Sequence, residues 1–262
     1  MSEVSLRRAQ WRGVLALVQR EVVGRVLRLW SQTLAPQVVV AALFVVVFGV
    51  ALGHQIRLIN GVPYQEFVVP GLTLMGVATA AFANNATSLY QARGDGFIED
   101  PVSSPMTPTQ LTVGYTVGGV VRGLIIGTLT LAAARVFVAF PLRHPLVLAA
   151  ALVATAVAFA ALGNVVGLHS KGWELQALVG NLVIQPLVFL GGVFYSVRTL
   201  DGPWRRLSHA DPILYMVEAT RHGVLGGGDV SLPVAMGVTV ALAVAMTCWS
   251  WVLFRRGVGL RT

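Results

Sequence analysis

Long apolar runs separated by short polar connections dominate the chain from residue 36 onward. Six of these runs are long enough to cross a bilayer core of about 30 Å at about 1.5 Å per helical residue. Five contain no Asp, Glu, Lys or Arg, and the third contains Arg122. The predicted spans are residues 36–53, 67–90, 111–134, 146–168, 175–197 and 230–254. This pattern predicts an all-α membrane protein with six transmembrane helices.

The first 34 residues follow a different pattern, with apolar and charged residues on separate faces of a predicted helix over 5–33. The apolar positions at helical spacing are Leu15, Val18, Val22, Val26 and Leu29. The charged positions of the other face are Arg20, Glu21, Arg25 and Arg28. Such a basic amphipathic helix is typical of a membrane interface, where Trp11 and Trp30 would suit the headgroup level. An ordinary helix packed on a soluble core is disfavoured, because the rest of the chain offers no soluble core.

Neither a low-complexity linker nor a clear internal repeat divides the remaining chain. We therefore predict an N-terminal amphipathic interfacial helix over 1–34 and one six-helix transmembrane domain over 35–262. There is no apolar stretch with a small-residue cleavage site near the start, so we expect the chain to enter the membrane through its first span.

Arginine supplies nearly all of the net charge of +8, on a chain with only 11% charged residues. In a membrane protein such an excess more often sets topology than binds nucleic acid. Eleven basic residues fall on the side of the termini, and seven fall on the opposite side. The difference places both termini in the cytoplasm.

Several chemistries are disfavoured by what the sequence lacks. The one lysine, Lys171, follows serine, so the chain has no P-loop, whose lysine must follow glycine. Five scattered histidines and one cysteine, Cys248, form no catalytic or metal-binding motif. The spans contain no Asp, Glu or His, which argues against proton coupling, although a sodium site built from carbonyl groups stays open. We expect no cofactor and no metal on this chain.

The connection between the second and third spans, residues 93–108, mixes apolar and acidic residues. The apolar residues are Phe97, Ile98 and Val102, and the acidic ones beside them are Glu99 and Asp100. A short helix here would present an apolar knob to the groove of another protein. The alternative is a solvated connector, which the local pattern alone favours.

A helix too short to span follows the fifth span and would lie on or dip into the outer leaflet. Asp211-Pro212 predicts its start, with Asp at the N-cap and Pro at the first helical position, and Gly223 predicts its end. Its apolar stripe is Leu214, Val217 and Val224. Glu218 is one turn from both Arg221 and His222 and could pair with either.

Glycines at four-residue spacing mark the third span, a pattern that lets helices approach closely. They are Gly114, Gly118, Gly119, Gly123 and Gly127. Arg122 lies within this stripe and needs a partner or water. A structural ion pair near the interface is favoured over contact with an anionic substrate. By residue type the candidate partners are Glu99, Asp100 and Glu218.

Five stretches, in their order along the chain, resemble the ABC-2 type permeases, the membrane subunits of bacterial exporters related to the daunorubicin and nodulation-factor exporters. They are Phe67-Val-Val-Pro-Gly-Leu, Gly118-Gly-Val-Val-Arg-Gly, Leu190-Gly-Gly-Val-Phe-Tyr-Ser, Asp211-Pro-Ile-Leu-Tyr-Met-Val-Glu-Ala-Thr-Arg and Arg255-Arg-Gly-Val-Gly-Leu-Arg. Two departures are Asp211, where the family usually has Asn, and Glu99-Asp100-Pro101 in place of a Glu-Glu-Leu-like run.

The resemblance implies a complex of two permease chains, expected to be a homodimer, with two copies of an ABC ATPase subunit that bind ATP and Mg²⁺. It implies that residues 93–108 are the coupling helix, which reverses the local preference for a connector. It also implies that the N-terminal helix lies on the cytoplasmic leaflet beside the ATPase. The segment 204–225, including Asp211, Pro212, Tyr215, Glu218 and Arg221, would be a re-entrant cap near the outer leaflet.

The leading hypothesis is therefore an ATP-energised exporter of amphipathic, lipid-like or drug-like substrates in the bacterial cytoplasmic membrane. Its path would lie between two copies of the chain. The alternatives are a stand-alone secondary carrier or channel and a membrane scaffold without transport. Membrane lipids are expected contacts in each case, and nucleic acid is not.

Overall fold

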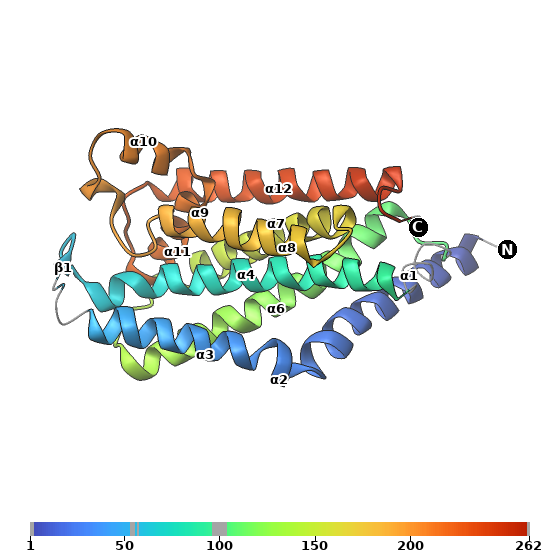
Figure 1. Cartoon of the computed structure of the whole chain (residues 1–262), viewed down its shortest axis with the longest axis horizontal. Coiled ribbons are helices and arrows are strands. Elements are labelled where there is room, and N and C mark those ends of the chain that lie inside the picture. Colours follow the sequence, from blue (N-terminus) through green and yellow to red (C-terminus); the bar gives the residue numbers. More distant parts are fainter. Residues whose placement is uncertain (1–2, 53–55, 57, 96–103, 261–262) are drawn as a thin grey trace.

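The computed structural model describes residues 3–52, 56, 58–95 and 104–260, which form a bundle of long helices along one common axis (Figure 1). Within these residues, six helices are long and apolar enough to cross a membrane, which confirms the predicted all-α architecture. These spans are Trp30–Phe48, Tyr64–Gly94, Pro108–Phe137, Pro145–His169, Trp173–Leu190 and Leu232–Arg256.

The elements of the first half are α1 (Glu3–Gln19), the π-helical η1 (Arg20–Leu27), α2 (Trp30–Thr33), α3 (Ala35–Phe44), the π-helical η2 (Val45–Ala51), β1 (Leu58–Ile59), β2 (Val62–Pro63) and α4 (Tyr64–Gly94). Those of the second half are α6 (Pro108–Phe137), α7 (Pro145–His169), α8 (Trp173–Leu178), the π-helical η3 (Val179–Ile184), α9 (Gln185–Leu190), the 3₁₀-helical η4 (Val197–Thr199), α10 (Gly202–Ala210), α11 (Pro212–Leu225) and α12 (Leu232–Arg256). The strands pair antiparallel across Asn60 and Gly61, whose φ angles of 52° and 80° suit a type I′ turn.

The prediction of one continuous helix over 5–33 is wrong, because the helix is interrupted between η1 and α2. Leu29 leaves the helical region, with φ −103° and ψ 28°. The Thr33 hydroxyl donates to the carbonyl oxygens of Val26 and Leu29, at 3.2 and 2.9 Å. A hydroxyl that donates to backbone carbonyl oxygens in this way competes with the regular backbone hydrogen bonds of the helix.

Two other predicted boundaries need correction at glycines. The fifth span ends at Leu190 and not at residue 197, and Gly192 then turns the chain with φ 77°. Gly223 does not end α11, which runs to Leu225 and is capped by Gly226 with φ 80°. Glycine at position 223 is instead explained by packing, because a Cβ there would lie 2.6 Å from the backbone of Leu148 on α7.

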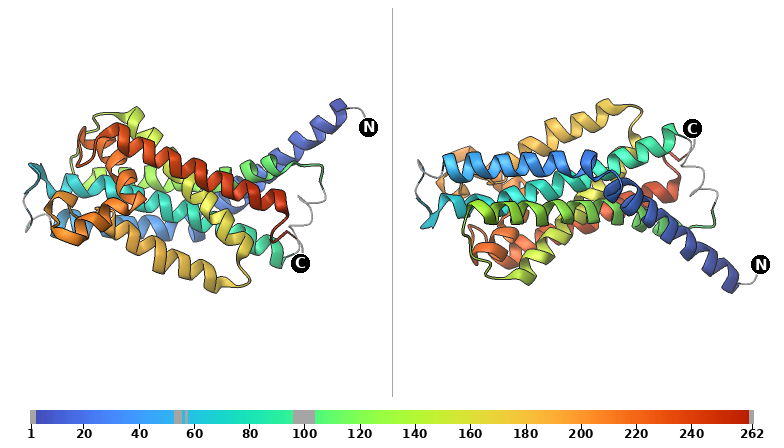
Figure 2. Two further views of the ribbon diagram at one scale, coloured as in Figure 1. Left: turned by 90° about the horizontal axis from the view of Figure 1, so that it is seen from above. Right: turned by 90° about the horizontal axis from the view of Figure 1, so that it is seen from below.

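The two ends of the bundle are referred to below as the terminal end and the hairpin end. α1 and the last turn of α12 lie at the terminal end, and the β1–β2 hairpin and α10 lie at the hairpin end (Figure 1). α1 leaves the bundle at an angle in the two views of Figure 2. This arrangement places both ends of the described chain on the same side, as an even number of spans requires.

α4 is the central helix, and the spans around it differ strongly in how well they are packed. In the most apolar window of α4, 78% of the residues are buried, against 17% for the first, fifth and sixth spans. α4 packs against α6, α7 and α11. The first and fifth spans therefore lie at the periphery, with much of their surface facing outward.

Candidate functional site

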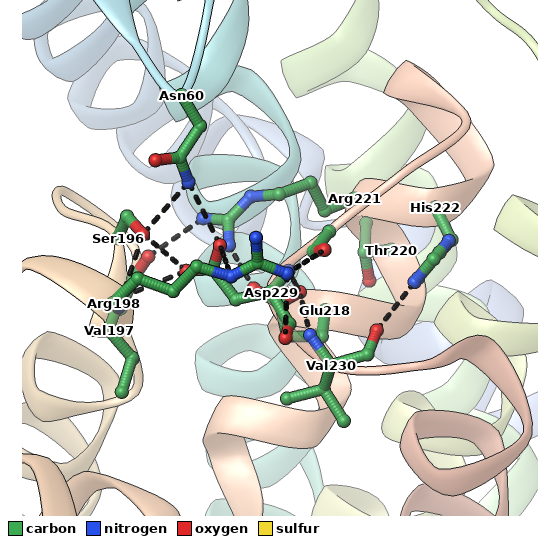
Figure 3. A network of polar contacts seen from close by, with 12 residues as sticks. Asn60, Ser196, Val197, Arg198, Glu218, Thr220, Arg221, His222, Asp229 and Val230 are labelled. Carbon is green, nitrogen blue, oxygen red and sulfur yellow. Dashed lines mark hydrogen bonds and ion pairs between the residues drawn. The ribbon is translucent and has the colours of Figure 1, made fainter.

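α11 carries a buried ion pair at the hairpin end, between Glu218 and Arg221 (Figure 3). Arg221 also donates to the carbonyl oxygen of Gly192 at 2.8 Å, and its guanidinium lies 3.9 Å from the ring centroid of Phe67 on α4. Of the two partners that the sequence allowed for Glu218, the structure selects Arg221. His222 instead contacts the carbonyl oxygen of Val230 at 2.7 Å.

The second carboxylate oxygen of Glu218 binds the chain between α11 and α12. It accepts hydrogen bonds from the backbone N–H groups of Asp229 and Val230, the second at 3.1 Å. Glu218 is fully buried, so these contacts and the ion pair replace its hydration. The carboxylate thus fixes the position of the α11–α12 connection.

Asp229 extends this network to the hairpin and to the segment after the fifth span. Its carboxylate accepts from Asn60 at 2.9 Å and from Ser196 at 2.5 Å, and it lies 3.3 Å from Nε of Arg198. Four separate stretches of chain therefore meet at the hairpin end around Glu218 and Asp229. Asp229 is not among the predicted site residues, since nothing in its local sequence distinguishes it from an ordinary loop aspartate.

Asp211 caps α11 as its position before Pro212 predicts, with its carboxylate accepting from the N–H of Ile213 at 2.9 Å. The second carboxylate oxygen is buried and has no hydrogen-bond partner among the described residues. Tyr215, one turn along, donates to the carbonyl oxygen of His209 at 2.9 Å. Burial raises the pKa of Asp211 to about 6, although the Ile213 hydrogen bond acts in the opposite direction.

Replacing Asp211 by asparagine is expected to stabilise the protein at pH 8, by about 2 kcal/mol. Asparagine keeps the N-cap and removes a charge that burial disfavours. Because the raised pKa penalises the ionised form, the advantage should be complete above pH 6 and should shrink as the pH falls toward 3.8, the ordinary value. Unfolding in detergent at several pH values measures this difference. Asp211→Ala, which loses the cap, should be less stable than asparagine throughout, and a destabilised Asp211→Asn protein at pH 8 would contradict the interpretation.

The N-terminal helix lies in a groove that two glycines of α6 leave open. A Cβ at Gly114 would lie 2.6 Å from Leu17, and one at Gly118 would lie 2.7 Å from the Cβ of Glu21. The glycine spacing thus serves a contact with the N-terminal helix as well as contacts between spans. A larger side chain at either position would push the helix off α6.

Glu21 was predicted on the polar face of this helix, but the structure buries it completely. Its carboxylate accepts from the Ser88 hydroxyl at 2.7 Å and lies 3.7 Å from Nε of Arg25. Arg25 also donates to Gln91 at 2.6 Å, so both residues bind α4. Burial raises the pKa of Glu21, against the Ser88 hydrogen bond and Arg25, and burial lowers the pKa of Arg25. Arg20 is half-buried and Arg28 is exposed.

The other three glycines of the stripe face α4. A Cβ at Gly119 would lie 2.6 Å from Asn85, one at Gly123 would lie 3.0 Å from the carbonyl oxygen of Val77, and one at Gly127 would lie 2.5 Å from a Val77 methyl group. These positions bring the backbones of α4 and α6 together.

A chain of buried amides and hydroxyls joins four spans beside this contact. Asn85 donates to Asn164 at 2.9 Å and to the carbonyl oxygen of Ala160 at 3.0 Å. Asn164 in turn donates to Thr116 at 3.1 Å and to Ser250 at 3.2 Å. Such hydrogen bonds between helices hold transmembrane segments in register.

Within the described residues, Arg122 contacts a backbone carbonyl and an amide, and not Glu218. Its guanidinium donates to the carbonyl oxygen of Thr33 at 2.9 Å and reaches the Gln37 amide oxygen at 3.5 Å. It therefore contacts the junction between the N-terminal helix and the first span. Glu218 is wrong as a partner, because its carboxylate is bound within the hairpin-end network, and Glu99 and Asp100 lie outside the described residues.

Two adjoining cavities run along α4 between the first and fifth spans. The larger, of about 360 Å³, lies mainly between α4 and the helices α8 and η3. The smaller, of about 270 Å³, lies between α3, α4 and α6. Gln37, Thr79 and Gln185 line both, so polar side chains connect the two spaces. No pattern in the sequence marks these residues, because uncharged polar residues are common in apolar runs.

The residues predicted to form the coupling knob, Phe97, Ile98, Glu99, Asp100 and Val102, lie outside the described residues. The chain on both sides of them is firmly held at the terminal end. Arg93 donates to the carbonyl oxygens of Gly167, Leu168 and Ser170 at the end of α7. Thr107 and Gln110 form a capping box that starts α6.

Comparison with known proteins gives a consistent result over almost the whole chain. The profile of a family described as ABC-2 type transporter matches residues 12–225. Inner membrane transport permease YadH of Escherichia coli strain K12 is 39% identical over 252 residues, covering 96% of this chain and 98% of that protein. Nodulation protein J of Sinorhizobium fredii strain NBRC 101917 / NGR234 is 25% identical over 201 residues, covering 75% of each chain.

Proposed function

Because the chain belongs to the ABC-2 type transporter family, we propose that it is the transmembrane permease subunit of an ATP-driven exporter. The chain has no P-loop, so ATP and Mg²⁺ bind two copies of a separate ABC ATPase subunit, which docks at the terminal end. The protein lies in the cytoplasmic membrane with both termini in the cytoplasm. The hairpin end then faces outward.

The observation that carries this proposal is the pair of cavities along α4. They place uncharged polar side chains inside a region of apolar spans, where such groups are costly unless they serve packing or a ligand. At the hairpin end, the network around Glu218 and Asp229 ties the connections between spans together. An amphipathic substrate moving along the spans suits this arrangement better than a small ion.

We place the proposed dimer interface at the first and fifth spans because their residues line both cavities. Both flank the cavities, and both expose large apolar side chains, including Val39 and Leu43 on the first span and Leu178 and Leu182 on the fifth. A second copy of the chain covering this face would enclose the cavities between two subunits. We therefore propose a homodimer with its path at the subunit interface.

Co-expression with a candidate ABC ATPase, followed by purification and reconstitution in nanodiscs, tests the proposal. We expect a stable complex whose ATP hydrolysis is several times faster than that of the ATPase alone. The permease should appear as two copies in the complex by native mass spectrometry. Transport by vesicles that contain only this chain would instead support the stand-alone carrier, and a chain that neither binds an ATPase nor transports would support the scaffold.

A further inference from the structure

A third cavity, referred to below as the apolar slot, lies on the side of the fifth span that faces α12. Its volume is about 160 Å³, and all the residues that line it in the described part of the chain are apolar. Phe159, Ile184 and Ile213 in its lining are buried, whereas Val183 and Leu187 are partly exposed, so the slot opens toward the last two. An engineered apolar cavity of about 150 Å³ holds a six-carbon ring, so the slot has room for a section of a hydrocarbon chain.

The slot lies away from the face of the fifth span that we assign to the dimer. Val183 and Leu187 each lie two residues, or about half a helical turn, beyond Asn181 and Gln185, which line the larger cavity along α4. In a homodimer joined around those cavities, the opposite side of the fifth span faces the bilayer. Lipid chains are then the material next to the slot.

The short helix α10 stands at the slot and is attached to the bundle at one end. It lies beside the hairpin-end parts of α9 and α12 in Figure 1 and in the left view of Figure 2. Ser208 is the one buried residue among the nine of this helix. The Tyr215 hydroxyl holds its last turn by donating to the carbonyl oxygen of His209 at 2.9 Å. Pro212, two residues beyond the end of α10, lines the slot.

The surface of α10 combines apolar and cationic side chains. Trp204 and Leu207, three residues apart and thus on one face, are 63% and 49% exposed. Arg205 and Arg206 are also exposed, and neither forms an ion pair within the described residues. Tryptophan suits the headgroup level of a bilayer, and unpaired arginines at that level attract anionic headgroups.

We propose that the apolar slot and α10 together bind one anionic phospholipid of the leaflet at the hairpin end, with phosphatidylglycerol as the representative chemistry. One acyl chain would occupy the slot, and Arg205 and Arg206 would bind the phosphate. The inference goes beyond the proposed function, because the lipid is held as a fixed component at the outside of the bundle and is not the transported molecule.

The spacing of the two parts suits a single lipid. Arg206 precedes Pro212 by six residues, which span at most about 20 Å even when fully extended. The hydrocarbon of one leaflet is about 15 Å deep, so a phosphate at α10 and a chain in the slot can belong to one molecule. The acidic neighbours do not neutralise the arginines, because Asp201 is not within ion-pair distance of either and Asp211 is buried at the start of α11.

Quenching of Trp204 by brominated lipids in nanodiscs tests the assignment. The nanodiscs consist of phosphatidylcholine with an increasing fraction of either phosphatidylglycerol or phosphatidylcholine that carries a brominated chain. The difference between the original chain and Trp204→Phe isolates the signal of Trp204 from that of the other tryptophans. We expect half-maximal quenching at an about tenfold lower fraction of the brominated phosphatidylglycerol, because two arginines near a membrane surface each attract an anionic lipid.

The headgroup contact is tested by changing the two arginines together. Arg205→Gln combined with Arg206→Gln should bring the two lipids to within about twofold of each other, because only the chain contact remains. Arg255→Gln combined with Arg256→Gln is the matched control, since these are also adjacent and exposed but lie at the terminal end. The control should keep the preference for phosphatidylglycerol at Trp204.

The chain contact is tested by filling the slot. Ala158 is buried and lines the slot, so Ala158→Leu should weaken quenching by both lipids several-fold. The melting temperature should stay unchanged or rise, because the new side chain occupies empty space. Ala150→Leu, at an exposed position of the same helix, is the matched control and should leave quenching unchanged.

Equal quenching by the two lipids, or a preference for phosphatidylglycerol that survives the double arginine variant, would overturn the proposal. Unchanged quenching in Ala158→Leu would do the same, because the chain would then lie outside the slot. Absence of quenching by either lipid would mean that protein, for example a second copy of the chain, covers this face. None of these readouts needs an ATPase or depends on which side of the membrane the hairpin end faces, so their failure is distinguishable from failure of the proposed function.

Discussion

Replacing Arg221 by methionine is expected to lower the free energy of unfolding by about 3–5 kcal/mol, because it leaves the Glu218 carboxylate buried without its counter-charge. Glu218 is fully buried, and within the described part of the chain only the two backbone N–H groups of Asp229 and Val230 would remain as partners. The variant also loses the hydrogen bond to Gly192 and the contact with the Phe67 ring. Unfolding in mixed micelles, followed by circular dichroism, measures the loss.

The controls for this prediction are Arg198→Met and a double variant. Arg198 faces Asp229 in the same network, but its side chain is 58% exposed, so its removal should cost less than about 1 kcal/mol. Glu218→Gln combined with Arg221→Met leaves no unpaired charge and should be less destabilised than Arg221→Met alone. If Arg221→Met and Arg198→Met cost the same, the buried pair does not hold the hairpin end together.

Replacing Phe97 and Ile98 by aspartate is expected to abolish stimulation of the proposed partner ATPase while leaving the bundle folded. The two changes convert the predicted apolar knob into a charged one, which would not enter an apolar groove on the ATPase. ATP hydrolysis by the reconstituted complex should fall to the rate of the ATPase alone. The measurement compares the double variant with the original chain in the same nanodiscs.

The described surroundings of this segment explain why its movement should reach the spans. Arg93, which precedes it, holds the end of α7, and Thr107, which follows it, caps α6. Met106 packs against Gly13 of α1, where a Cβ would lie 3.0 Å from its sulfur. A force on the segment therefore acts on α1, α6 and α7 together.

Leu142→Asp is the matched control, since Leu142 is an exposed leucine in the α6–α7 connection at the hairpin end. It introduces one negative charge, against two in the double variant, on the side proposed to face outward and should leave ATPase stimulation unchanged. Loss of stimulation in Leu142→Asp but not in the double variant would reverse the proposed orientation. Stimulation that survives in both variants would move the coupling role to another segment.

Hydropathy alone was sufficient to predict the six spans, because a helix in lipid must be apolar along its whole length. The start of α11 was equally predictable, since Asp211-Pro212 is a local signal that satisfies the first turn of a helix whatever surrounds it. The glycine spacing predicted close approach of helices, but not which helices. Gly114 and Gly118 receive the N-terminal helix, whereas Gly119, Gly123 and Gly127 face α4.

The polar contacts of the candidate site could not be predicted in this way. Glu21 shares a helix face with arginines, and its burial depends on Ser88, 67 positions away. Arg122 finds a backbone carbonyl of the first span, an acceptor that every residue carries and no sequence pattern marks. Partners that are distant in sequence, and acceptors on the backbone, leave no periodic signal.

The groove that holds the N-terminal helix also constrains the order in which the protein can be assembled. Leu17 and Glu21 rest on Gly114 and Gly118, which belong to the third span. During synthesis the N-terminal helix therefore cannot dock on the third span until nearly a hundred further residues have been made and inserted. Until then we expect its arginines to stay at the membrane surface. A nascent chain stopped after the second span would have α4 in place but no α6 to complete the groove. Docking of the N-terminal helix is thus a late event that reports correct insertion of the third span.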